Sequence, residues 1–264
     1  MRISVFGLGE AGSLISADLV LAGVTVSAYD PADVITPKGV IRVDKPAQAV
    51  IEADAVIALT QGSEAVVAIE QALDQIPATA HYADFSSNSP GTKKQLAEIA
   101  TSRGLAFTDI ALLGTVPGKG LRTPALASGS GANRFVNTFS ALGMPVSEVS
   151  ATAGDAAIRK LLRSVMMKGL AGCVIEAMRA AEKADCAEWL WSNLADEITH
   201  ADERLLSRLV RGSGPHALRR LHEMEAAMAM LQELEVEPVM TRGTVENLRQ
   251  IPQQGLPEIP VLPD

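Results

Sequence analysis

The chain has 264 residues, of which 47% are hydrophobic and 3% aromatic, and its formal net charge is −8. This length allows one large domain or two ordinary ones, and the hydrophobic share is enough for a sizeable core of aliphatic side chains. The acidic balance, with no cluster of Lys and Arg, argues against a nucleic-acid partner, because duplex binding needs clustered cations that displace counterions.

Two further features of the sequence indicate the cellular environment of the protein. Cys173 and Cys186 are isolated and form no ligand pattern with histidine, so we expect neither a disulfide nor a metal site. No uncharged run approaches the roughly 18 apolar residues of a membrane span, and the first residues lack the apolar segment of a signal peptide. We therefore expect a cytoplasmic protein without a membrane partner.

Short β-branched runs alternate with amphipathic stretches in the first half of the chain. We expect strands at residues 2–6, 25–30, 40–43, 55–60, 81–86, 106–112 and 124–129. We expect helices at residues 11–22, 45–53, 63–73 and 92–103. Strands that alternate with helices are typical of βαβ units, in which a parallel sheet is covered on both faces. This half is predicted to be an α/β domain with a doubly wound parallel sheet of the Rossmann type.

The strand pattern stops at Gly154, and the sequence after it is predicted to be helical. We expect helices at residues 155–184, 187–210, 215–235 and 243–250. Prolines crowd the final residues and indicate an extended tail. The predicted organisation is an α/β domain at 1–152, an all-α domain at 153–252 and a Pro-rich extended tail at 253–264.

Glycines follow the first predicted strand, in the sequence SVFGLGEAGS. Gly7, Gly9 and Gly12 match G-x-G-x-x-G between a strand and a helix, as in dinucleotide-binding proteins. There the first glycine allows the tight turn, the second lets the backbone approach a pyrophosphate, and the third lets helix and strand pack closely. The helix N-terminus would offer N–H groups to phosphates. The alternative is a bend that binds no ligand.

Asp30 ends the second predicted strand, where dinucleotide-binding proteins place an acidic residue. Its carboxylate can accept hydrogen bonds from the adenosine ribose hydroxyls and would repel a 2′-phosphate. The pattern therefore predicts that residues 1–152 bind NAD. Arg42 or Lys38, folded over the ribose, would make NADP possible instead.

Four stretches of the chain follow the pattern of one family. They are GLGEAG at 7–12, DFSSNSP at 84–90, DIALLGTVPG at 109–118 and GDAAIRKLLRS at 154–164. Together they resemble the β-hydroxyacid dehydrogenase family, which includes 3-hydroxyisobutyrate and 6-phosphogluconate dehydrogenases, in a branch with a divergent C-terminal half. The resemblance implies an oxidoreductase whose all-α domain binds a small-molecule substrate and forms a homodimer.

The resemblance also implies roles for individual residues. Lys160 falls on the catalytic lysine of the family. Cofactor binding falls on Gly7, Leu8, Gly9, Glu10, Ala11, Gly12, Asp30, Thr60 and Ser87. Substrate binding falls on Leu113, Gly114, Thr115 and Ser164.

At several motif positions the chain departs from the family. Leu113 replaces a serine, Thr115 replaces a glycine, and Ser164 replaces an asparagine. Ala11 replaces a methionine, and His222 stands where a late lysine is expected. These changes leave open which substrate the chain takes.

The predicted helix at 155–184 carries a basic stripe on an otherwise apolar sequence. Lys160, Arg163, Ser164, Met167 and Lys168 recur at the spacing of one helix face. Such a stripe is either a solvated surface or the wall of an anion-binding cleft. In a cleft, Lys160 would exchange the hydroxyl proton during hydride transfer, provided that burial or the neighbouring cations lower its pKa from about 10.4.

These features predict an NAD(P)-dependent hydroxyacid dehydrogenase that interconverts a small anionic β-hydroxy acid and its oxo form. Lys160 is the general acid/base, and Arg163 and Lys168 help to hold the substrate anion. Two alternatives stay open. One is an imine reductase, although relatives with that activity usually carry another residue in place of Lys160. The other is a dinucleotide-binding sensor without catalysis.

Overall fold

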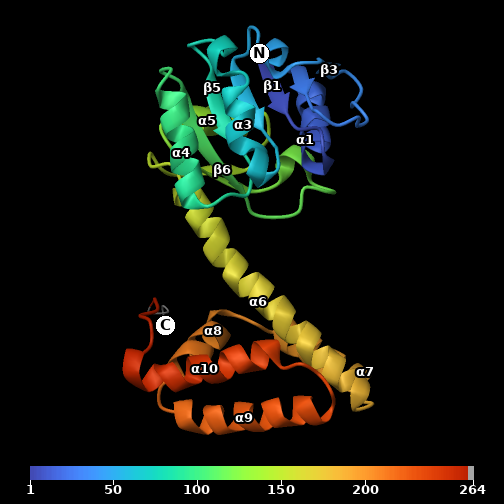
Figure 1. Cartoon of the computed structure of the whole chain (residues 1–264), viewed down its shortest axis with the longest axis vertical. Coiled ribbons are helices and arrows are strands. Elements are labelled where there is room, and N and C mark those ends of the chain that lie inside the picture. The colour runs from blue at the N-terminus through green and yellow to red at the C-terminus, as the bar shows by residue number, and fades with distance from the viewer. Residues whose placement is uncertain (261–264) are drawn as a thin grey trace. The chain divides into compact units, whose positions relative to one another are not determined.

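The structure is a computed structural model that describes residues 1–260. The chain forms two compact units, the first covering Met1–Arg163 and the second beginning at Ser164. The functional division predicted at residue 152 stays a prediction, because compactness alone does not assign a role to either unit. Figure 1 shows the helices and strands of each unit.

The first unit is built on one sheet of eight strands within the described residues, in the order β3-β2-β1-β4-β5-β6-β7-β8. All neighbouring strands run parallel except β6 and β7, so the predicted doubly wound α/β fold is confirmed. The strands are β1 (Arg2–Phe6), β2 (Thr25–Tyr29), β3 (Ile41–Arg42), β4 (Ala55–Ala58), β5 (His81–Asp84), β6 (Ala106–Leu112), β7 (Ala125–Ser128) and β8 (Val146–Ser150).

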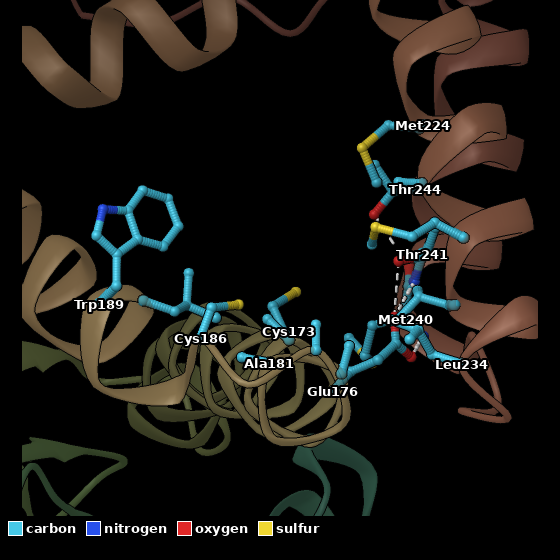
Figure 2. A pocket seen from close by; sticks show the side chains of 17 residues that line it. Cys173, Glu176, Ala181, Cys186, Trp189, Met224, Leu234, Met240, Thr241 and Thr244 are labelled. Atoms are coloured by element: carbon cyan, nitrogen blue, oxygen red, sulfur yellow. Dashed lines mark hydrogen bonds between the residues drawn. The ribbon is translucent and has the colours of Figure 1, made fainter.

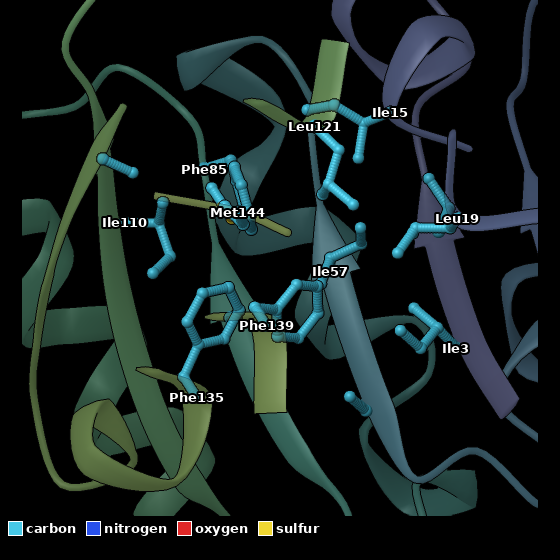
Figure 3. Close-up of a cluster of buried hydrophobic side chains, with 14 of the residues drawn as sticks. Ile3, Ile15, Leu19, Ile57, Phe85, Ile110, Leu121, Phe135, Phe139 and Met144 are labelled. Carbon is cyan, nitrogen blue, oxygen red and sulfur yellow. The ribbon is translucent and has the colours of Figure 1, made fainter. Parts of the chain in front are cut away.

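Helices cover both faces of this sheet, because successive side chains of a strand point to opposite faces. Val5 and Ile57 belong to a buried cluster with side chains of α1 (Glu10–Leu21) and α5 (Ala132–Ala141). Figure 3 shows this cluster, in which the rings of Phe135 and Phe139 stack with centroids 4.0 Å apart.

The opposite face packs in the same way. Phe6 and Val56, each next in sequence to a residue of the first cluster, belong to a second cluster with side chains of three other helices. Those helices are α2 (Pro46–Ala49), α3 (Ala65–Glu70) and α4 (Pro90–Thr101). The predicted helix at 63–73 is therefore wrong in extent, because a 3₁₀ turn at Gly62–Glu64 precedes α3 and another follows it.

Residues 132–150 form an element pair that the sequence analysis did not predict. The backbone N–H of Gly131 donates to the carbonyl of Phe107 at 2.8 Å, and α5 begins directly after it. This helix returns the chain to the edge of the sheet, where β8 pairs parallel with β7. Since β7 and β8 are parallel, α5 between them forms the last crossover of the sheet.

Five helices within the described residues make up the helical half: α6 (Asp155–Lys183), α7 (Ala187–Thr199), α8 (Glu203–Arg211), α9 (Ala217–Glu233) and α10 (Val239–Gln254). The bounds of α6 agree with the helix predicted at 155–184 to within one residue. The single helix predicted at 187–210 is wrong, because Asp202 accepts a hydrogen bond from the Leu205 N–H at 3.0 Å and starts α8. None of the described helices combines the length and the apolar sequence that a bilayer span requires.

The end of the chain differs from its predicted tail. α10 continues through Pro252 to Gln254, and no regular structure follows up to residue 260. The last four residues of the tail predicted at 253–264 lie outside the described residues.

Glu176 fixes where α10 starts. Its carboxylate accepts hydrogen bonds from the Thr241 N–H at 2.9 Å, the Thr241 hydroxyl at 2.7 Å and the Met240 N–H at 2.7 Å. Burial alone would raise the pKa of Glu176, but these hydrogen bonds outweigh it and hold the pKa below its ordinary value of 4.5. The ionised carboxylate therefore stabilises the helical unit above that ordinary pKa, and the contribution is lost as pH falls through the lowered value.

Candidate active site

The glycine turn joins β1 to α1. Gly7 has φ +94°, and a Cβ there would lie 2.6 Å from the carbonyl oxygen of Leu59. A Cβ on Gly12 would lie 1.9 Å from the carbonyl oxygen of Gly7, so the helix rests directly on the turn. A Cβ on Gly9 would meet no atom within 4 Å. The outer two glycines serve the close packing of the backbone, and the middle one leaves open space.

Asp30 ties the end of β2 to this turn. Its carboxylate accepts hydrogen bonds from the Leu8 N–H at 2.6 Å and from the Ala32 N–H at 2.8 Å. A carboxylate has about four lone-pair positions, so two stay available for further donors. Gly9, at the N-cap of α1, has no side chain that could cover the first N–H groups of the helix. The hydrogen bond to Leu8 therefore brings the Asp30 carboxylate next to the turn from which α1 starts, although the two bonded residues are 22 positions apart in the sequence.

Arg42 is held by the loop that follows Asp30. Its guanidinium donates to the carbonyls of Val34 at 2.6 Å and Asp30 at 3.1 Å, and also to that of Ala32. Lys38 lies exposed on the same loop. The arginine thus orders the loop backbone beside the Asp30 carboxylate.

A cavity of about 490 Å³ opens beside the glycine turn. Gly7, Gly9 and Asp30 line it together with Leu59 and Thr60, which follow β4. The order of the strands reverses between β1 and β4, and ligands of open α/β sheets bind at the carboxyl ends of the strands at such a point.

The cavity fits a dinucleotide on three observations. Gly9 leaves room for a pyrophosphate, the start of α1 supplies N–H donors, and Asp30 keeps free lone pairs for ribose hydroxyls. The Thr60 hydroxyl is buried and has no hydrogen-bond partner among the described residues, so it is available to a ligand. Glu10 and Ala11 lie in the first turn of α1, as the motif requires.

Lys160 and Ser87 meet although they are 73 residues apart in the sequence. The Nζ of Lys160, in the second turn of α6, donates to the Oγ of Ser87 at 2.7 Å. Ser87 follows β5, and the next side chain, Asn88, donates to the carbonyl of Gly62 at 3.0 Å. The segment after β4 that lines the cavity is therefore bound to the loop that contacts Lys160.

The remaining predicted substrate residues fall in two places. Leu113, Gly114 and Thr115 follow β6, where the Leu113 N–H donates to the Pro124 carbonyl at 2.7 Å. Arg163, Ser164 and Lys168 lie on α6, the last two in the second unit, and His222 lies on α9. Their roles toward a substrate stay predictions.

A second cavity, of about 460 Å³, lies within the helical unit. Side chains of α6, α7, α9 and α10 form most of its wall, with alanine, leucine and methionine the most frequent, and Figure 2 shows Trp189 and Met224 on opposite sides of it. Cys173 is exposed at this cavity and both cysteines are free thiols. The carboxylate of Glu176 is the charged group in its wall, and it is bound to the start of α10.

Sequence reasoning missed a group of charged residues next to Ser87. Lys93, Asp84 and Asp109 are buried, with exposed fractions of 1%, 0% and 0%. The signal that could have found them is a carboxylate inside an otherwise apolar strand, as in AFTDIAL at 106–112. Such a residue needs a buried partner.

With this geometry in place, comparison with known proteins decides the family. Residues 2–135, just over half of the chain, match the family model described as the NAD binding domain of 6-phosphogluconate dehydrogenase. The chain belongs to this family. Residues 181–251 match a second family model, a domain of unknown function called DUF1932. The resemblance predicted from the four motifs is therefore confirmed, and so is an NAD(P)-binding fold of the dehydrogenase type.

Individual relatives agree with this assignment. An uncharacterized 28.5 kDa protein in the 7S RNA 5′ region of Methanothermus fervidus is 25% identical over 170 residues, which cover 64% of this chain and 65% of that protein. The chain thus spans about two thirds of the length of this curated relative.

Two solved structures share the fold. A conserved protein of unknown function, described as structurally similar to 3-hydroxyacid dehydrogenases, is 26% identical with a TM-score of 0.61, covering 95% of this chain and 96% of that chain. An imine reductase from Streptomyces aurantiacus is 18% identical with a TM-score of 0.79, covering 97% of this chain and 95% of that chain. At that identity the second likeness shows the fold alone.

The three glycines predict different effects of the same substitution. Gly12→Ala forces a methyl group into the Gly7 carbonyl and should destabilise the protein by about 3 kcal/mol or more. Gly9→Ala meets no atom and should leave the melting temperature nearly unchanged, yet weaken dinucleotide binding by about tenfold or more because the methyl group fills the phosphate space. Thermal unfolding and fluorescence titration with NADH and NADPH measure both effects. A Gly9→Ala protein that binds the dinucleotide normally would contradict the placement of the pyrophosphate.

Proposed function

We propose that this protein is an NAD(P)-dependent hydroxyacid dehydrogenase that interconverts a small anionic β-hydroxy acid and its oxo form, with Lys160 as the general acid/base. The observation that carries the proposal is the contact of the Lys160 Nζ with the Ser87 Oγ at 2.7 Å. Ser87 lies on the loop after β5, which Asn88 joins to the segment lining the dinucleotide cavity. A proton-transferring group is thus held at the same edge of the sheet as the cofactor cavity.

In this proposal the residues of the chain have distinct roles in the reaction. The bound nicotinamide supplies the hydride chemistry, while the protein supplies position and charge. Lys160 returns a proton to the substrate oxygen in reduction and takes it in oxidation. Ser87 accepts a hydrogen bond from the Lys160 Nζ and so limits where that nitrogen can lie. Arg163, one turn further along α6, supplies a positive charge for a carboxylate or a similar anion.

Reduction of a C=N bond is the second candidate function. The fold likeness to the Streptomyces aurantiacus imine reductase supports it as an alternative, at a TM-score of 0.79. Both reductions take up one proton, on oxygen or on nitrogen, so a proton donor alone does not separate them. Lys160 favours the hydroxy acid because relatives that reduce imines usually carry another residue in its place. Turnover of cyclic imines, with none of β-hydroxy acids, would decide for the reductase.

We further propose that NAD is preferred over NADP. The proposal rests on Asp30, which lines the cavity and whose carboxylate would repel a 2′-phosphate. Arg42, which could neutralise such a phosphate, donates its hydrogen bonds to three loop carbonyls.

Replacing Lys160 tests the general acid/base. Lys160→Met should lower kcat by about 10²- to 10⁴-fold, because the proton transfer loses its partner, while NADH affinity stays within about twofold. Lys94→Met, which removes an exposed lysine of α4, is the matched control and should leave both values unchanged. Reaction rates over a panel of β-hydroxy acids, followed by nicotinamide absorbance, give the answer. Retained activity in Lys160→Met would remove the lysine from the mechanism.

Replacing Asp30 tests the cofactor preference. Asp30→Ala should raise the affinity for NADPH relative to NADH by about tenfold or more, since the repulsion of the 2′-phosphate is lost. Titrations of both reduced cofactors against the wild type and the variant provide the ratio. An unchanged ratio would show that Asp30 does not select the cofactor.

We also propose that the chain forms a homodimer through its helical unit. Trp189 and Trp191 are 67% and 60% exposed, and Trp189 stands at the apolar cavity of that unit. Tryptophans exposed beside an apolar hollow are typical of interfaces, whose cores are enriched in aromatic side chains. Sedimentation equilibrium should give twice the mass of the chain, and Trp189→Ser should shift the equilibrium toward the single chain. A wild type that sediments as a single chain would refute the dimer.

A further inference from the structure

A buried cation lies between two carboxylates below the loop of Ser87. The Nζ of Lys93 is 2.6 Å from Asp84 Oδ2 and 3.0 Å from Asp109 Oδ1. Asp84 and Asp109 are register partners on the parallel strands β5 and β6. Side chains in register point to the same face, so the two carboxylates are neighbours and would repel each other without the ammonium.

On one side, hydrogen bonds join this cluster to the start of α6. Asp109 Oδ2 accepts hydrogen bonds from the Ala157 N–H at 3.0 Å and from the Ser128 hydroxyl at 3.2 Å. The Ser128 oxygen in turn accepts from the Ala156 N–H at 3.0 Å. These N–H groups belong to the first turn of α6, where the helix itself offers no acceptor. A buried negative charge therefore holds the positive end of the helix that carries Lys160.

On the other side, hydrogen bonds join the cluster to the loop of Ser87. The Ser86 hydroxyl donates to Asp84 Oδ2 at 2.7 Å, and the Ser86 oxygen accepts from the Asn88 Nδ2 at 2.8 Å. The residues on both sides of Ser87 are thereby bound to the cluster. Lys93 also donates to the backbone carbonyl of Asp84 at 3.0 Å, which fixes the end of β5.

From these contacts we infer that Lys93, Asp84 and Asp109 are positioning residues that hold Lys160 against Ser87. The cluster holds the elements that carry the two residues of the 2.7 Å contact. It binds α6, which carries Lys160, through Ser128, and it binds the loop of Ser87 through Ser86. The catalytic meaning of this positioning rests on the proposed function of Lys160. The positioning itself is a property of the folded chain and can be measured without a substrate.

Two small substitutions each remove hydrogen bonds on one side of the cluster. Ser128→Ala removes the link to the first turn of α6, and Ser86→Ala removes the link to the Ser87 loop. Ser16→Ala is the matched control, because Ser16 is also fully buried and its hydroxyl has no hydrogen-bond partner among the described residues. Asp109→Asn is the stronger variant, since it places an amide where Lys93 needs a carboxylate.

The first readout is the rate at which an amine-specific acylating reagent labels Lys160, followed by mass spectrometry of the peptide that contains it. Lys160 should be labelled about threefold faster or more in Ser128→Ala and Ser86→Ala, because the amine is no longer held at the Ser87 oxygen. Ser16→Ala should label at the wild-type rate. Wild-type labelling rates in both serine variants would overturn the proposal, whether or not Asp109→Asn folds.

The second readout separates positioning from general stability. With an active substrate, kcat should fall about tenfold in Ser128→Ala and Ser86→Ala while the affinity for NADH stays within about twofold. An unchanged kcat together with faster labelling would overturn the catalytic use of the positioning. Absence of turnover in the wild type on every hydroxy acid and imine, with faster labelling in the variants, would instead refute the proposed function and leave the positioning standing.

Discussion

The ammonium group of Lys93 is buried, and several elements of the first unit contact it or the carboxylates beside it. An unpaired buried ammonium would be unfavourable by several kcal/mol, so the fold must bring carboxylates to it. Asp84 and Asp109 meet that demand from neighbouring strands in register, which requires β5, β6 and α4 to adopt one relative arrangement. The same carboxylates then accept N–H and O–H donors from α6 and the Ser86 loop. A charge that needs partners thereby orders the backbone around Lys160.

The dinucleotide cavity and the lysine lie at the same edge of the sheet for a topological reason. β1, β2, β4 and β5 run parallel, so the loops that follow them leave the sheet at their carboxyl ends. The glycine turn follows β1, Asp30 follows β2, and Ser87 follows β5. No single segment forms the site. The order of the strands places side by side groups that lie far apart in the sequence.

The sequence predicts the local elements well and the contacts between them poorly. The glycine turn, Asp30 and the helix at 155–184 follow from patterns within a few residues, and the structure contains each of them. The role proposed for Lys160 comes from the resemblance, and its contact with Ser87 could not be predicted without the fold. Asp84 and Asp109 begin two of the four motifs, but their pairing through Lys93 was missed because it depends on β5 and β6 being neighbours in register. The break before α8 was missed because one capping side chain, Asp202, outweighs a continuous amphipathic pattern.

The proposed preference for NAD and the shape of the glycine turn both depend on Asp30. Two of its lone pairs are used by the N–H groups of Leu8 and Ala32, which hold the glycine turn and the loop after β2. These hydrogen bonds fix the orientation of the carboxylate, and so the direction of the lone pairs that the proposed cofactor site would offer to a ribose. Asp30→Asn removes the charge and also replaces one oxygen by an NH₂ group, so the side chain can accept from the N–H of Leu8 or of Ala32 but not from both. The repulsion proposed for a 2′-phosphate depends on the charge of Asp30, whereas the geometry of the turn and of the loop after β2 depends on its two oxygens.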